Sequence, residues 1–154
     1  MPKTKSYGKK TDLALDVFTK LARASATVGK LSAENIKAFG LTEPQFAVIE
    51  ALGHLGPLFI GDLCKKMLVS GGNMTVVVDN LEKESLVERI RSEEDRRSIR
   101  IRLTGKGEKL FDTIFRTHAG FIMDMISILT EKEQLTLGRL LKKLGRSLAS
   151  RQPG

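Results

Sequence analysis

Residues 70–103, SGGNMTVVVDNLEKESLVERIRSEEDRRSIRIRL, decide the fold, because a helical pattern gives way to a strand pattern within them. Apolar residues first recur at i, i+3, i+4 and i+7, at Met74, Val77, Val78 and Leu81. This spacing gathers them on one side of a helix over residues 72–85, and that side is expected to face the core. The opposite side is small or polar, with little charge at its N-terminal end, so it can approach another surface closely.

Two short segments rich in β-branched residues follow this helix. Residues 86–91 and 98–103 predict an antiparallel hairpin, and the second segment alternates strictly between apolar residues and arginines. The connecting residues, 92–97, include nothing apolar. This loop must therefore project into solvent or onto a charged partner.

A shorter apolar stripe precedes the helix, at Ile60, Leu63, Cys64 and Met67. It predicts a helix over residues 60–67, joined to the next one by a short link that contains glycine. Helix, tight turn and second helix is the arrangement that places one helix in the major groove of DNA. The hairpin that follows makes this a winged form of the motif.

Further helices are expected on both sides of this region. Thr42 and Gln45 form a capping-box pattern that begins one of them, and Thr130 with Glu133 forms another inside residues 104–149. The helices over 11–33 and 104–149 carry more apolar surface than a small domain can cover, so they are expected to pair with a second copy of the chain.

The predicted fold class is mainly α with a small antiparallel β-hairpin, a winged helix-turn-helix with N- and C-terminal dimerisation helices. Residues 1–154 are expected to form a single domain, with the winged helix-turn-helix part at 42–103 and the helical dimerisation part at 11–33 and 104–149.

Composition limits the class of protein and its partners. The chain has 154 residues, 41 % hydrophobic and 29 % charged, which is ordinary for a globular domain. No apolar run approaches the roughly 18 residues of a membrane span, and no secretory signal is recognised at the start. A single cysteine fits a reducing, cytoplasmic location. The net charge of +8 favours an anionic partner, and double-stranded DNA fits the motif.

Three short motifs resemble those of the multiple antibiotic resistance regulator (MarR) family: LEKESLV at 81–87, DRR at 95–97 and LTGKG at 103–107. Their order and spacing are more specific than any one of them. One departure is Glu84-Ser85, where the family commonly has a glycine just before Leu86. The resemblance implies a homodimeric, sequence-specific transcriptional regulator, a repressor released from its operator by a small aromatic or phenolic ligand. It implies no catalysed reaction and no cofactor.

The residues expected to contact DNA lie on the second helix and on the hairpin. By position, polar side chains of the helix can reach phosphates or base edges, and Val76 can touch a thymine methyl group. The resemblance implies that Arg97 enters the minor groove and that Asp95 braces this arginine or the loop. Arg100 and Arg102 are expected in solvent. The full set is Ser70, Gly72, Asn73, Thr75, Val76, Lys83, Arg91, Asp95, Arg96 and Arg97.

The ligand pocket is expected, again from the resemblance, between the dimer helices and the DNA-binding part. Phe18, Phe46, His54 and His118 are its candidate residues. The two histidines lack the spacing of metal ligands, so no metal site is expected.

Two alternative functions remain open. A thiol-based redox-sensing regulator would use Cys64, although the position of this residue on an apolar stripe favours a buried structural role. A non-specific architectural DNA-binding protein is the other, because few long hydrogen-bond donors line the helix that would read the bases.

Overall fold

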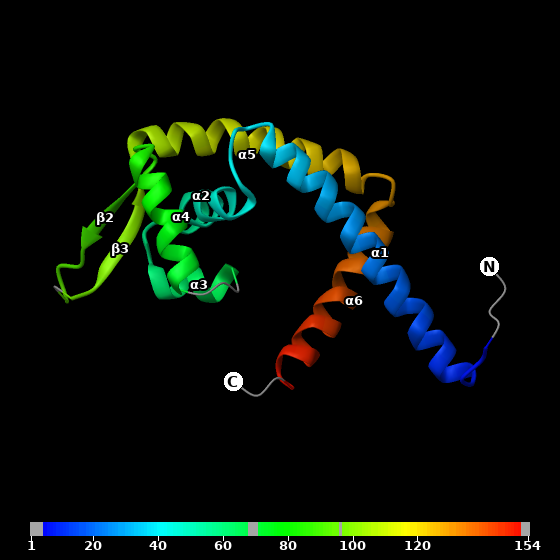
Figure 1. Ribbon diagram of the computed structural model, residues 1–154. Coiled ribbons are helices and arrows are strands. Elements are labelled where there is room, and N and C mark those ends of the chain that lie inside the picture. Colours follow the sequence, from blue (N-terminus) through cyan, green and yellow to red (C-terminus); the bar gives the residue numbers. More distant parts are fainter. Residues whose placement is uncertain (1–4, 68–70, 96, 152–154) are drawn as a thin grey trace. The chain divides into compact units, whose positions relative to one another are not determined.

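The computed structural model describes residues 5–67, 71–95 and 97–151 (Figure 1). The chain divides into two units, Met1–Ile114 and Phe115–Gly154, with the boundary inside one long helix. The first unit contains α1 (Lys9–Lys37), α2 (Glu43–Leu55), β1 (Leu58–Phe59), α3 (Ile60–Met67), α4 (Gly71–Lys83), β2 (Val87–Arg91), β3 (Ile99–Leu103) and the start of α5 (Gly105–Ile126). The second contains the rest of α5 and α6 (Glu131–Ala149).

Threonine side chains begin three of the helices. The Thr42 hydroxyl accepts from the backbone N–H of Gln45, and the Gln45 side chain accepts from the Thr42 N–H, which is a complete capping box. Thr130 and Glu133 do the same at α6. Both predicted helix starts are confirmed. At α5 the Thr104 hydroxyl accepts from the Gly107 N–H at 3.1 Å.

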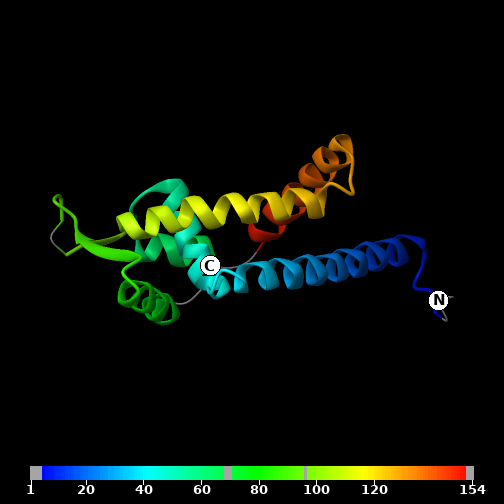
Figure 2. The same ribbon diagram turned by 90° about the horizontal axis from the view of Figure 1, so that it is seen from above.

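The hairpin is confirmed, but a third strand joins it. Strands β2 and β3 pair antiparallel from Val87 opposite Leu103 to Arg91 opposite Ile99. The short strand β1 pairs with the other edge of β3, giving the order β1-β3-β2. Strand β1 was not predictable, because a two-residue strand after a glycine- and proline-containing turn is too short to show alternation. The β2–β3 hairpin projects from its unit in both views (Figures 1 and 2).

The core of the first unit is enclosed mainly by α2, α3, α4 and the strands β2 and β3. Met74, Val78 and Leu81 of α4 are fully buried, and Val77 is partly buried against the same core, so the core face predicted from this spacing is confirmed. Ile101 and Leu103 of β3 are buried too, whereas Ile99 is 42 % exposed near the projecting tip of the hairpin. The other buried apolar residues are Ile36, Phe46, Val48, Ile49, Leu52, Leu63, Leu86, Val87 and Ile114.

The two outer helices bury little of their apolar surface within the chain. Helix α1 is continuous over Lys9–Lys37, longer than the predicted 11–33, and Ile36 near its C-terminal end is its buried residue (Figure 2). Every residue of α6 is described, and none is buried. Its leucines at 135, 137, 140, 141, 144 and 148 are 41–69 % exposed. None of the described helices is long and apolar enough to cross a membrane.

Candidate DNA-binding interface

Helix α4 has one buried face and one exposed face. Opposite its buried face, Gly72, Asn73, Thr75, Val76 and Lys83 are all exposed, and Val76 is 59 % exposed although it is apolar. These are five of the residues that the sequence assigns to DNA. Ser70 and Arg96, two more of them, lie outside the described residues. Apart from Lys83, these exposed residues have small side chains, so another surface can approach the backbone of α4 closely on this side.

Ser85, which stands where the resembled family commonly has glycine, lies in the turn that ends α4. The Leu86 N–H donates to the Leu81 carbonyl at 3.0 Å, and the Ser85 N–H donates to the Glu82 carbonyl at 2.9 Å. This pair of hydrogen bonds is the Schellman motif, whose turning residue adopts a left-handed conformation. Ser85 adopts it, with φ +61°, and is the one non-glycine residue with positive φ among those described.

A second set of contacts fixes this turn to the start of α5, and we call it the α4–α5 joint (84–86 and 104–107). The Thr104 N–H donates to the Leu86 carbonyl at 3.1 Å, and its hydroxyl donates to the Ser85 carbonyl at 2.6 Å. Lys106 Nζ donates to the Glu84 carbonyl at 2.8 Å. Gly107 lies so close that a Cβ atom there would be 2.0 Å from the Leu86 oxygen. Three successive carbonyls beyond the end of α4 are thus bonded by the first turn of α5 and its cap.

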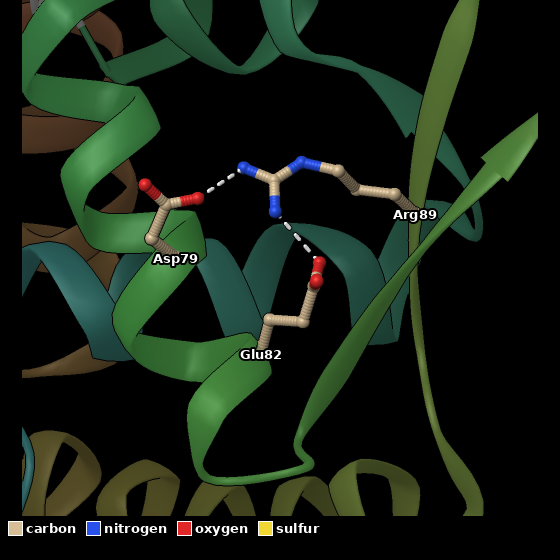
Figure 3. A network of polar contacts seen from close by, with 3 residues as sticks. All are labelled: Asp79, Glu82 and Arg89. Carbon is tan, nitrogen blue, oxygen red and sulfur yellow. Dashed lines mark hydrogen bonds and ion pairs between the residues drawn. The ribbon is translucent and has the colours of Figure 1, made fainter.

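Helix α4 is also connected to the hairpin, by Arg89 of β2 (Figure 3). One guanidinium nitrogen lies 2.5 Å from Asp79 Oδ1, and the other lies 2.7 Å from Glu82 Oε2. Both carboxylates belong to α4 and are one helical turn apart. The hydrogen bond with Asp79, followed by that with Glu82, raises the pKa of Arg89 against the opposing effect of burial.

Arg89 is not among the functional residues predicted from the sequence, although the strand pattern contains a signal for it. Strand alternation places Arg89 on the same face of β2 as the buried Val87, and it pairs with the buried Ile101. An arginine on a core-facing side of a strand needs a partner. Two acids at i and i+3 on the adjacent helix are the residues that could supply it.

At the tip of the hairpin, Asp95 organises the turn. Its carboxylate accepts from the Arg97 N–H and from the Ser98 hydroxyl, both at 2.9 Å. The backbone hydrogen bond from Arg97, and then that from Ser98, lowers the pKa of Asp95. The expectation that Asp95 braces the loop agrees with this geometry. The side chains of Arg97 and of Arg91, at the end of β2, are exposed.

On the outer face of the hairpin, the prediction that Arg100 is solvated is wrong. Arg100 was expected in solvent, but it is partly buried, and its guanidinium lies 4.7 Å from the centre of the Phe59 ring. The cause is the unpredicted strand β1, which places Phe59 opposite Arg100. Arg102 remains half exposed and pairs with Glu88 of β2 at 2.6 Å.

The four candidate ligand residues lie in different surroundings. Phe46 is 3 % exposed in the core, whereas Phe18 on α1 is 68 % exposed. His54 is exposed at the end of α2, where its Nδ1 lies 2.8 Å from the Glu50 carbonyl and its ring meets the edge of Phe111. His118 is 8 % exposed in the second unit. The ligand pocket stays a prediction.

A cleft of about 340 Å³ opens beside the C-terminal end of α2. The four candidate ligand residues are all described, and none of them lines this cleft. Its lining is Leu52, Gly53, Gly56, Pro57, Arg102, Leu103, Glu108, Phe111 and Asp112. Cys64, the other residue considered as a sensor, is partly buried on α3 and packs against the core without a disulfide partner among the described residues.

Comparison with known proteins places this site in a family. A family model described as the MarR family matches residues 41–99, which run from the start of α2 to the start of β3. The HTH-type transcriptional regulator MhqR of Bacillus subtilis is 36 % identical over 135 residues, which are 88 % of this chain and 93 % of that protein. This chain belongs to the MarR family. Members of this family that resemble it are transcriptional regulators. The matched residues include α2, α3, α4 and β2, and they end at the first residue of β3.

Solved structures support the MarR assignment at the level of the fold. A MarR family protein from Bacillus stearothermophilus aligns with a TM-score of 0.76 and 25 % identity, covering 92 % of this chain and 99 % of that one. A MepR-like protein complexed with pseudoligands is 33 % identical, with a TM-score of 0.62, and the alignment covers 89 % of this chain and 97 % of that one. The winged helix-turn-helix fold with flanking helices is therefore shared with the MarR family.

The names of two further MarR-like relatives differ in the sign of regulation. The transcriptional repressor MdtR of Bacillus subtilis is 28 % identical over 114 residues, which are 74 % of each chain. The transcriptional activatory protein BadR of Rhodopseudomonas palustris is 28 % identical over 126 residues, which are 77 % of this chain and 72 % of that protein. Relatives at the same level of identity thus include a repressor and an activatory protein.

Proposed function

We propose that this MarR-family regulator is a homodimer that binds a pseudo-palindromic operator and represses transcription. In each protomer α4 enters a major groove, and the tip of the β2–β3 hairpin reaches the adjacent minor groove with Arg97. No catalysed reaction belongs to this proposal. The observation that carries it is the exposed face of α4 beside an arginine-tipped hairpin in the same unit, with Arg89 of the hairpin paired to two acids of α4.

The exposed side chains of α4 have the chemistry for both kinds of DNA contact. Asn73, Thr75 and Lys83 supply polar groups for phosphates and base edges, and Val76 supplies an apolar surface for a thymine methyl group. The net charge of +8 provides a long-range attraction to the phosphate backbone. Since few long donors lie on α4, much of the discrimination is assigned to groove shape and to the hairpin.

The test of this function is selection of an operator followed by competition. Duplexes are enriched from a random library by the wild-type protein, and binding to the enriched site is then competed with random duplex. A specific regulator is expected to prefer its site by roughly a thousandfold or more. A preference below about tenfold would instead support a non-specific architectural protein.

The role of the hairpin tip is tested by Arg97→Ala against Arg102→Ala. Both substitutions remove one positive charge from the same hairpin, but Arg102 lies on its outer face and pairs with Glu88. Loss of a minor-groove arginine is expected to weaken operator binding by about tenfold or more, and loss of Arg102 by much less. The measurement is operator affinity at fixed salt, with sedimentation as the check on assembly. Equal losses would contradict the proposed role of Arg97.

The proposed effector is a small aromatic or phenolic molecule that releases the operator. It would act by binding more tightly to a conformation in which the two α4 helices are wrongly spaced, so its effect is limited by that difference in affinity. The 33 % identical MepR-like structure, which holds pseudoligands, supports a ligand-binding role. Operator binding measured with a series of phenols and aromatic acids tests it, and linkage requires the operator to weaken ligand binding by the same factor.

A further inference from the structure

We infer that Arg89 is a positioning residue for DNA recognition, which holds α4 at a fixed angle to the hairpin so that both grooves of one duplex are engaged together. This inference rests on the proposed function and deepens it. Arg89 itself lies on the core-facing side of β2 and is not among the residues assigned to DNA. Its partners, Asp79 and Glu82, lie on α4.

The geometry makes the contact sensitive to the orientation of the helix. The guanidinium is planar and rigid, and its two terminal nitrogens reach two different carboxylates, at 2.5 Å and 2.7 Å (Figure 3). Because the carboxylates are one turn apart on α4, rotation or sliding of the helix against β2 lengthens at least one of the two ion pairs. The Arg89 side chain is 26 % exposed, less than Arg102 in the control pair, whereas Asp79 and Glu82 are nearly half exposed. Solvent and salt therefore screen these pairs in part.

The charges add a second, separable effect. Asp79 and Glu82 belong to the helix that approaches the phosphate backbone, and unpaired carboxylates there would repel it. Arg89 offsets part of that charge. The two effects predict opposite changes in operator affinity when Asp79 and Glu82 are replaced by neutral residues. Losing two negative charges strengthens non-specific attraction to DNA, whereas losing the partners of Arg89 releases the helix.

The hairpin contains a matched control. Arg102 pairs with Glu88 at 2.6 Å, a distance similar to those of Arg89, and removing it changes the net charge by the same amount. However, Glu88 and Arg102 face each other across β2 and β3, so their pair connects two strands of the hairpin and does not involve α4. A difference between the two arginines therefore reports on the connection to α4.

The experiment uses the full-length protein and an operator selected with the wild type. The variants are Arg89→Gln, Arg102→Gln and the double variant Asp79→Asn/Glu82→Gln. Affinity is measured for the operator and for random duplex, and hydroxyl-radical footprinting follows protection of the minor groove. Thermal unfolding and sedimentation establish that each variant is folded and assembled.

Arg89→Gln is expected to lose about tenfold or more in operator affinity and to lose the minor-groove protection, while Arg102→Gln loses little. The double variant, despite its more positive charge, is expected to bind the operator more weakly and random duplex at least as tightly as the wild type. Arg89→Lys, which keeps the charge but not the two-pronged contact, is expected to bind random duplex like the wild type and to lack the minor-groove protection on the operator.

Two results would overturn the inference. The first is equal operator affinity for Arg89→Gln and Arg102→Gln, and the second is tighter operator binding with an unchanged footprint in the double variant. If Arg89→Gln fails to fold, the inference is tested by the operator affinity and the footprint of the double variant, which retains the arginine. A wild-type protein without preference for any duplex would instead refute the proposed function, so the two failures are distinguishable.

Discussion

Ser85 occupies the turn between α4 and β2 in a left-handed conformation, with φ +61°. A side chain in this region costs roughly 1–2 kcal/mol, because Cβ approaches the following carbonyl oxygen. Glycine has no such cost, and the Schellman hydrogen bonds that end α4 involve only backbone atoms of Ser85. The serine is therefore strained at a position where its side chain is not required by the turn.

Ser85→Gly is expected to raise the free energy of unfolding by about 1 kcal/mol, reduced somewhat by the greater freedom of glycine in the unfolded chain. Chemical denaturation measures it. Ser92→Gly in the loop after β2 is the control, since Ser92 has no positive φ to relieve. An equal or larger gain from Ser92→Gly would show that the strain at Ser85 is not the cause.

The hydrogen bonds of Asp95 make the turn at the hairpin tip dependent on pH. Its pKa is lowered because its carboxylate accepts hydrogen bonds, first from the Arg97 N–H and then from the Ser98 hydroxyl. A lowered pKa in the folded state means that the stabilising contribution is present above the ordinary value of about 3.9 and is lost as pH falls through the folded pKa. The tip of the hairpin is thus expected to keep its turn at neutral pH and to loosen only in acid.

Carboxyl NMR titration checks this expectation. The Asp95 midpoint should lie below that of the same aspartate in a peptide of residues 91–100, and exchange of the Arg97 amide should accelerate below that midpoint. Coincident midpoints for the protein and the peptide would show that the Asp95 hydrogen bonds do not persist in solution.

At the scale of elements, patterns spread over many residues were predictable from the sequence. Helix α3 was expected over 60–67 and is observed as Ile60–Met67, and both capping boxes and the pairing of the hairpin are confirmed. Periodicity and capping are local, so a single sequence displays them.

Contacts between elements were less predictable. The roles of Arg89 and Arg100 depend on which helix or strand lies opposite each residue, and β1 is too short to show a period. The expected DNA face of α4 followed from its spacing. The connection between α4 and the hairpin required the three-dimensional arrangement.

The α4–α5 joint gives a prediction at this scale. Gly107→Ala would place Cβ about 2.0 Å from the Leu86 carbonyl oxygen, which is backbone and cannot move without displacing the turn after α4. We expect a loss of about 2 kcal/mol or more in the free energy of unfolding. Gly105→Ala, at the other end of the same turn, meets nothing within 4 Å and serves as the control in denaturant unfolding. Similar stabilities for the two variants would contradict the close contact.

For the whole molecule, the exposed apolar faces of α1 and α6 are the main apolar surface that the rest of the chain does not cover. Leu140 and Leu144 of α6 are 48 % and 41 % exposed, and the structure describes every residue of α6 without a buried one among them. Contiguous apolar surface of this kind marks an interaction site. The proposed homodimer would cover it.

Leu144→Gln is expected to weaken this assembly by about tenfold or more, since burying one leucine contributes roughly 1.5–3 kcal/mol. Analytical ultracentrifugation over a range of concentrations measures the effect. Lys142→Gln, on the opposite side of α6, is expected to leave the dissociation constant nearly unchanged. A wild-type protein that sediments as a monomer at all concentrations would refute the proposed homodimer.

None of the described residues of α6 is buried within its own chain. The stability of this helix is therefore expected to depend on pairing with a second protomer, and so on protein concentration. At protein concentrations well below the dissociation constant, a lone protomer would carry a long helix with little to oppose its fraying, and frayed helices are readily cut by proteases. Newly made or surplus protomers would then be removed faster than paired ones. The lifetime of this regulator in a cell would rise with its own abundance.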